Sequence, residues 1–182
     1  RKLVDQKTNY LLAKPFTISS KSAAHQKALN GVFDARARAE VKSLGKEAIK
    51  KGIGWVQLYI GEEGTLRLKR LPTEQILPEW ADDEHTRLDC LIRVYPQVAY
   101  EGREKVLLER AELWSAQGVE RFVRRMGGGR FAPDADLGAR ESHFAVDGAP
   151  WNWDAPPFLW VRYCEEELPL LHFVRELIDD YN

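Results

Sequence analysis

The alternation of apolar and polar residues is strongest between Gly52 and Trp80. Gly61–Gly64 supplies residues for a tight turn, because two of its four positions are glycines that can take positive φ. After the turn, Leu66 and Leu68 alternate with charged residues, which predicts a second strand with one wet face. The stretch therefore predicts a β-hairpin around which the chain is organised. In the first strand, one face carries Trp55, Gln57 and Tyr59, and the other carries Val56, Leu58 and Ile60.

Two helices are predicted before the hairpin. The first covers Lys2–Ala13 and ends at Lys14-Pro15, since a residue that precedes proline avoids the α region. Ser19–Ala24 is small and polar and predicts a flexible link. The second helix covers Phe33–Lys51, where Lys50 and Lys51 suit the negative end of the helix dipole and Gly52 suits the cap. Its apolar stripe is Phe33, Ala37, Val41, Leu44 and Ala48.

After the hairpin, the pattern predicts further strands without helices between them. Pro78 predicts an edge position or a break. A strong strand follows over Thr86–Tyr95, then a hairpin around Glu101-Gly102-Arg103, and then a strand over Val119–Arg125. The fold class expected is α+β, with an antiparallel β meander packed against a few helices. In the strong strand, the residues expected to share one face are Leu88, Cys90, Ile92 and Val94.

The last third of the chain begins with an irregular segment. Gly127–Pro150 has few apolar residues, so we expect a long, mobile loop. A strand is predicted over Phe158–Tyr163, and a final helix over Pro169–Tyr181, with proline in its first turn. The stripe of that helix is Leu171, Val174, Ile178 and Tyr181.

The length of 182 residues, the six tryptophans and an apolar content of 44% fit one domain with a core of its own. We divide it into a helical arm and helix (1–51), the meander (52–126), the long loop (127–150), and a strand with the C-terminal helix (151–182). No apolar run approaches the roughly 18 residues that would span a bilayer. The chain starts without methionine and without a secretory segment, so we interpret it as a fragment.

Charge is unevenly distributed along the chain. Residues 1–51 hold 12 Lys/Arg and 4 Asp/Glu, a net charge of +8, whereas residues 52–182 hold 15 and 24, a net charge of −9. A basic arm on an acidic body suggests contact with nucleic acid or with an acidic neighbour. The alternative is a helix with a solvated basic face.

Residues that could carry chemistry are scattered. The four histidines have no metal-ligand spacing, and Gly127-Gly128-Gly129 is not followed by the residues of a phosphate-binding loop. The acidic turn Asp82-Asp83-Glu84-His85 lacks the pattern of a calcium loop. We predict no catalytic, cofactor-binding or metal residues and single out no nucleic-acid contact. The remaining candidates are the histidines His25, His85, His143 and His172, the tryptophans Trp151 and Trp153, which could stack on bases or pack in the core, and the free thiols Cys90 and Cys164.

Several segments, in this order, together resemble a known family. Val4–Thr17 is similar to an opening K-x-N-Y-L-L-G-K-P, with Ala13 where glycine is usual. A second similar segment begins at Leu44–Ala48 and continues through Gly52–Val56 to Tyr59 and Gly64. The further segments are Ile76–Trp80 followed by Leu91–Tyr95, then Trp151-Asn152, Pro157-Phe158 and Leu177–Asn182. The chain thereby resembles the portal proteins of tailed bacteriophages, in the SPP1-type group, over almost its whole length.

This resemblance implies a structural, non-enzymatic subunit from a phage or prophage, without cofactors. Such proteins form a ring, usually of twelve copies, at one capsid vertex in the virion, after assembly in the host cytoplasm. Double-stranded DNA passes through the ring during packaging and ejection, and terminase, head–tail connectors and capsid proteins bind it; no membrane is involved. The matched region looks like the outer wing, with the final helix leading to stem and clip beyond Asn182.

Two other hypotheses remain open. One is a nucleic-acid-binding module that uses the basic helix 33–51, whose affinity would fall with salt. The other is an enzyme built on the loop 127–150, although no nucleophile or metal site is apparent there.

Overall fold

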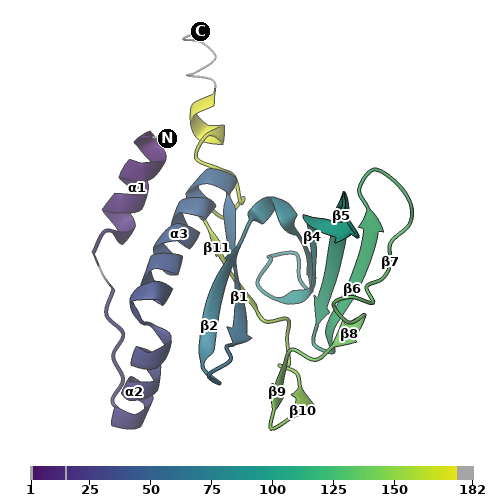
Figure 1. Ribbon diagram of the computed structural model, residues 1–182. Helices are drawn as coiled ribbons and strands as arrows, with labels where there is room; N and C mark the ends of the chain where they lie inside the picture. The colour runs from purple at the N-terminus through teal and green to yellow at the C-terminus, as the bar shows by residue number, and fades with distance from the viewer. Residues whose placement is uncertain (1, 15, 176–182) are drawn as a thin grey trace. The chain divides into compact units, whose positions relative to one another are not determined.

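The structure is a computed structural model that describes residues 2–14 and 16–175. The chain divides into two compact units (Figure 1). Unit 1 comprises Arg1–Thr73 and Phe158–Asn182, and unit 2 comprises Glu74–Pro157. Unit 2 is therefore inserted into the sequence of unit 1. Helices and antiparallel sheets confirm the α+β class expected from the sequence.

The helices of unit 1 are α1 (Lys2–Leu12), α2 (Ala23–Val32) and α3 (Ala35–Lys51). The sequence predicted α1 and α3 but placed a flexible link where α2 begins. α2 buries no residue, so it shows no apolar stripe that could have revealed it. The predicted start of α3 at Phe33 is two residues early, because the Asp34 carboxylate accepts a hydrogen bond from the Ala37 amide at 2.8 Å and caps the helix.

α3 forms the core of unit 1 much as its stripe predicts. Ala37, Leu44 and Ala48 are buried. At Gly45 the helix lies so close to α1 that an added Cβ would meet the Leu12 side chain at 2.4 Å. Gly52 ends the helix at φ 92°, where a Cβ would meet the Glu167 carbonyl oxygen at 1.6 Å. Only glycine fits this cap.

A three-stranded sheet, in the order β11-β1-β2, packs against α3. β1 (Ile53–Ile60) and β2 (Leu66–Leu71) form the predicted hairpin, and β11 (Phe158–Arg162) returns from the far end of the chain to pair with β1. β1 is therefore a central strand, and its first half is buried on both faces. Trp55 lies beside Trp160 with ring centroids 5.8 Å apart, whereas Gly54 lies against Leu44 of α3.

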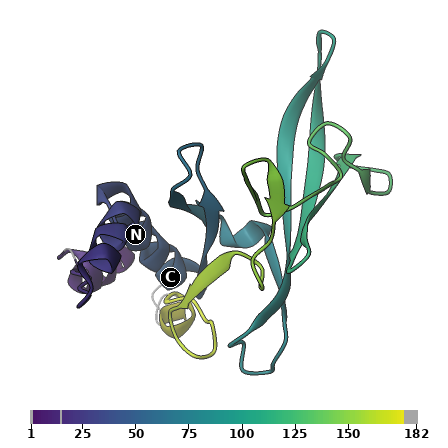
Figure 2. The same cartoon turned by 90° about the horizontal axis from the view of Figure 1, so that it is seen from below.

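Unit 2 is built on the predicted meander. Figure 2 shows its two longest strands, β4 (Leu88–Glu101) and β5 (Glu104–Ser115). β3 (Ile76–Trp80) is an edge strand, as Pro78 predicts, and β6 (Gly118–Arg125) pairs with β5. Two short strands, β7 (Ala132–Pro133) and β8 (Arg140–Glu141), pair with β6.

Two expectations about the meander need correction. The hairpin β1–β2 and the strands β3 to β8 belong to different sheets, separated by Pro72 and the 3-10 turn η1 (Thr73–Gln75). The core beside α3 therefore includes β1, β2 and β11, and not the meander as a whole.

The predicted face of β4 is also wrong in part. Trp80 pairs with Leu88 but Glu79 pairs with Cys90, so Asp89 is an extra residue in the ladder. A bulge of this kind shifts which residues face which side. Leu88 and Leu91 are consequently buried, while Ile92 is 37% exposed.

The segment after β6 is less irregular than the sequence suggested. Besides β7 and β8, it holds a hairpin of β9 (Phe144–Val146) and β10 (Ala149–Trp151). Mobility of the segment stays a prediction. At the C-terminal end, β11 is confirmed, and a 3-10 helix η2 (His172–Val174) lies where the final helix was predicted. The rest of that prediction, with Ile178 and Tyr181, lies outside the described residues.

We predict that Leu44→Asp destabilises the protein by roughly 3–5 kcal/mol, because it places an unpaired charge in the core beside β1. The exposed Ala39 lies on the same helix, so Ala39→Asp serves as the control and should change stability little. Chemical denaturation followed by circular dichroism measures both. Equal effects of the two substitutions would show that the stripe of α3 is misassigned.

Candidate functional site

A row of cations follows one side of α3. Arg38, Lys42, Lys46 and Lys50 recur every four residues, which places them on neighbouring turns of the helix; we call these four residues the basic ridge. Lys46 binds Asp5 of α1, and Lys50 lies 3.5 Å from Glu47. Arg38 and Lys42 are exposed and make no ion pair with any described residue. The middle of the ridge therefore carries uncompensated positive charge.

Two grooves flank this helix within unit 1. Arg38 and Lys42 line the first groove, of about 380 Å³, together with Lys14 and the apolar Leu11 and Phe16. The second groove, of about 490 Å³, is lined by further cations of α3 and β2, together with Gln57 and Tyr59 of β1. Its basic residues are Arg36, Lys69 and Arg70, of which Arg70 lies 3.9 Å from both Glu40 and Glu47. In the second groove, Glu40 and Glu47 offset part of the positive charge, whereas Arg38, Lys42 and Lys14 give the mostly apolar first groove a basic edge.

The first turn of α3 is neutralised locally. Asp34 caps the helix, and its carboxylate also lies 3.2 Å from Arg67 of β2. The hydrogen bond from the Ala37 amide and the charge of Arg67 hold the pKa of Asp34 below its usual value. This end of the helix is therefore occupied by the protein's own carboxylate, and the ridge beyond it is the part open to a partner.

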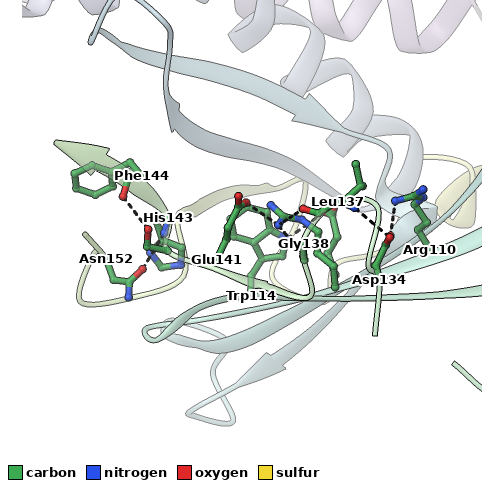
Figure 3. Close-up of polar contacts among 12 residues, drawn as sticks. Arg110, Trp114, Asp134, Leu137, Gly138, Glu141, His143, Phe144 and Asn152 are labelled. Atoms are coloured by element: carbon green, nitrogen blue, oxygen red, sulfur yellow. Dashed lines mark hydrogen bonds and ion pairs between the residues drawn. The ribbon is translucent and has the colours of Figure 1, made fainter. Parts of the chain in front are cut away.

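In unit 2, a buried ion pair holds the segment after β6 against the sheet (Figure 3). Arg110 of β5 binds Asp134, and the side chains are 6% and 1% exposed. The other Asp134 oxygen accepts hydrogen bonds from the amides of Asp136 and Leu137. Arg121 donates to the carbonyl oxygens of Leu137 and Gly138 and to Glu141. Such a pair stabilises the arrangement only while both charges are present.

Further charges are buried on the same face of the sheet. Glu112 accepts hydrogen bonds from Tyr95 at 2.9 Å and from Trp114 at 3.2 Å, and Arg93 lies 3.6 Å from it. Burial, followed by the charge of Glu112, raises the pKa of Tyr95 to about 12. The phenol therefore stays protonated and acts as a donor. These contacts build a rigid polar layer and resemble no acid–base pair.

His143 lies in an aromatic sandwich next to this layer. Its ring stacks on Trp114 at 5.9 Å and on Trp153 at 5.6 Å between centroids, and its Nδ1 accepts a hydrogen bond from the Trp153 amide at 3.1 Å. Asn152 bridges the His143 amide and the Gln117 carbonyl oxygen. The imidazole holds the end of the segment in place as a neutral ring.

The other residues that the sequence singled out serve local structure. His25 lies in α2, His85 stacks on Trp80 with centroids 4.8 Å apart, and His172 lies in η2. Asp82 closes the acidic turn by accepting hydrogen bonds from Thr86. Among residues 2–14 and 16–175, no three His, Cys, Asp or Glu side chains are placed to hold a metal ion.

The glycines, thiols and tryptophans also lie apart from one another. Gly127 and Gly128 form a turn after β6. Burial raises the pKa of the Cys90 thiol, and the Cys164 sulfur accepts a hydrogen bond from the Leu168 amide. Trp153 packs on His143, whereas Trp151 is 56% exposed. Of the residues singled out from the sequence, the structure brings His143 and Trp153 together, in a stacking contact that serves packing.

Sequence reasoning named the cations of α3 but missed the polar layer of unit 2. Arg110 and Glu112 alternate with Ala111 and Leu113, a pattern that predicts a solvent-exposed charged face, whereas the structure buries both charges. Asp134 gave no signal, because an isolated aspartate in a loop is ordinarily exposed.

No described helix is both long enough and apolar enough to cross a membrane.

We predict that acidification reduces the contribution of His143 to the stability of the folded protein. Burial lowers its pKa, although the backbone at Ser115 and Gly118 offsets part of the shift. The neutral ring is therefore favoured in the folded state, so its contribution to stability is complete above about pH 6.5. That contribution declines as the pH falls below this value and is lost once the pH passes the lowered pKa of the folded state.

The measurement is the melting temperature of the protein and of His143→Gln between pH 8 and pH 5. The stability difference between the two proteins should shrink toward pH 5. A difference that stays constant, or grows, would contradict a neutral buried imidazole.

Comparison with known proteins gives two matches. The model of a family described as phage portal protein, SPP1 Gp6-like, matches residues 1–182. The portal protein of Bacillus phage SPP1 is 27% identical over 183 residues, which cover 98% of this chain and 35% of that protein. The chain thus spans about a third of the length of the curated relative that it matches.

Proposed function

Because the chain belongs to the family of SPP1 Gp6-like phage portal proteins, we propose that it forms the outer, wing-like part of a portal subunit. The single observation that supports this proposal is the family match over the full chain, residues 1–182. In this proposal, the parts that build the stem, clip and crown of the subunit lie outside this chain. The role is structural and requires no catalytic group.

The assembled protein, in our proposal, is a ring of about twelve subunits at one vertex of the capsid. Its channel conducts double-stranded DNA during packaging and ejection. Terminase, head–tail connectors and capsid proteins bind the ring, which assembles in the host cytoplasm and remains in the virion. The two units described above supply rigid outer surfaces for such contacts, since both have a core and ordered sheets.

A second function is favoured by the basic ridge. Arg38 and Lys42 are exposed and uncompensated, and Lys14 lines the same groove. We propose that this surface contacts the phosphates of nucleic acid in addition to the structural role. Phosphate contacts give affinity without sequence specificity, so this contact would not depend on the sequence of the DNA.

We predict that the isolated 182-residue chain is monomeric or weakly associated at micromolar concentration. A persistent interface buries about 1,000 Å² or more, and the parts expected to dominate ring closure lie outside this chain. Size-exclusion chromatography with light scattering measures the mass. A stable ring of about twelve copies formed by this chain alone would show that the wing carries the assembly energy.

We also predict that the chain binds duplex DNA at low salt, with a log affinity that falls linearly with log salt concentration. The double substitution Arg38→Gln and Lys42→Gln should reduce the slope by about 2, since each lost phosphate contact removes about 0.9. The matched control is Arg103→Gln with Lys105→Gln, two exposed cations at the β4–β5 turn of unit 2. Fluorescence anisotropy measures the affinities. If the chain does not bind at low salt, or if both pairs of substitutions have equal effects, the nucleic-acid role is wrong.

A further inference from the structure

One face of the sheet of unit 2 carries exposed apolar residues. Residues that lie opposite each other in neighbouring strands share a face, so Leu77, Ile92 and Leu113 lie together, and so do Val94, Ala111 and Phe122. We call the side of the sheet that carries these residues the open face. The other side carries Leu91, Trp114 and Arg110, against which His143 and Asp134 pack.

The open face is largely apolar and exposed, apart from the ion pair of Glu109 with Arg124 and from Glu120, which lies opposite Leu113. Leu77 is 60% exposed, Val98 and Leu107 are each 44% exposed, and Phe131 is 37% exposed. At its centre is a hollow of about 410 Å³ with an entirely apolar lining of Ile92, Val94, Ala111, Leu113, Phe122 and Phe131. Arg124 lies over the Phe131 ring at 4.4 Å and holds it at the rim. A contiguous apolar surface of this kind marks an interaction site.

A matching surface lies on α1. The helix packs on α3 through Asp5, Thr8 and Leu12, and its outward side carries Leu3, Tyr10 and Leu11. These residues are 55%, 90% and 63% exposed. Their spacing of seven and eight residues is that of a helix whose apolar side fills a groove. We call them the outward stripe.

The two units that carry these surfaces have opposite net charge. The only carboxylate of α1, Asp5, is bound to Lys46, so the remaining charges of the helix, Lys2 and Lys7, are positive. Lys7 also donates a hydrogen bond to the Tyr163 hydroxyl at 3.1 Å. Unit 2, Glu74–Pro157, holds 16 Asp/Glu and 10 Lys/Arg, a net charge of −6, whereas the sequence of unit 1 has a net charge of +5. Attraction between opposite charges steers such surfaces together.

We propose that the outward stripe of one copy docks in the hollow of the open face of a second copy. This inference rests on the proposed portal function, because a ring is closed by head-to-tail contacts in which two different surfaces of the same chain meet. Three side chains of one helix bury less than the roughly 1,000 Å² of a persistent interface. The contact is therefore weak between two isolated chains and gains strength when it is repeated around a closed ring.

Directed cross-linking tests the contact. In a chain with Cys90→Ala and Cys164→Ser, one protein carries Tyr10→Cys and a second, larger tagged protein carries Phe131→Cys. Both positions are exposed, so folding should be retained, and circular dichroism checks this. Mild oxidation of the mixture should give several-fold more mixed dimer than a control in which Leu159→Cys, at a 52% exposed residue of β11, replaces Tyr10→Cys. Leu11→Glu added to the Tyr10→Cys protein should remove the excess.

Mixed dimer at the level of the control would overturn the inference, as would an excess that Leu11→Glu leaves unchanged. The same pair of cysteines in the complete protein separates this inference from the proposed function. A ring that forms but shows no cross-link between neighbouring subunits refutes the docking contact alone. Cross-linking of the chain without a ring in the complete protein supports the contact and refutes the portal assembly.

Discussion

The pairing of β1 with β11 is the contact on which the arrangement of unit 1 depends. Residues 53–57 pair with residues 158–162, so this contact joins the two parts of the unit 1 sequence between which unit 2 is inserted. Loop-closure entropy grows only slowly with length, so a folded insertion of this size costs little more than a short loop. Two further contacts secure the junction: Leu170 donates its amide to the Ile49 carbonyl oxygen, and the cap at Gly52 leaves no room for a side chain beside Glu167.

Unit 2 differs from unit 1, because its sheet buries charged residues on one side and exposes apolar residues on the other. The pair Arg110–Asp134 and the contacts of Glu112 fix one arrangement of the covering segment, since removal of one partner leaves a buried charge unpaired. Such contacts give specificity more than stability. The open face carries the apolar surface that we propose a second copy of the chain buries.

Local patterns in the sequence predicted α1, α3, the hairpin β1–β2 and the meander, because periodicity and turn residues act over short distances. The pairing of β11 with β1 joins residues about a hundred positions apart and left no local trace. The bulge at Asp89 separated Leu88 from the face that Cys90, Ile92 and Val94 share, although the strand itself was predicted. Of the candidate surfaces, the cations of α3 were visible in the charge pattern. The hollow of the open face was not, because it depends on the register of three strands.

The family match over residues 1–182 supports the proposal that the chain is an outer part of a larger assembly, and this placement is the central claim. The most direct measurement is an electron cryo-microscopy map of the ring formed by the complete protein, or of the vertex of the assembled capsid. We predict that unit 1 and unit 2 both fit density at the outer rim of the ring, with other parts of the subunit around the channel. Density for α3 or for the β4–β6 sheet on the wall of the channel would contradict the account.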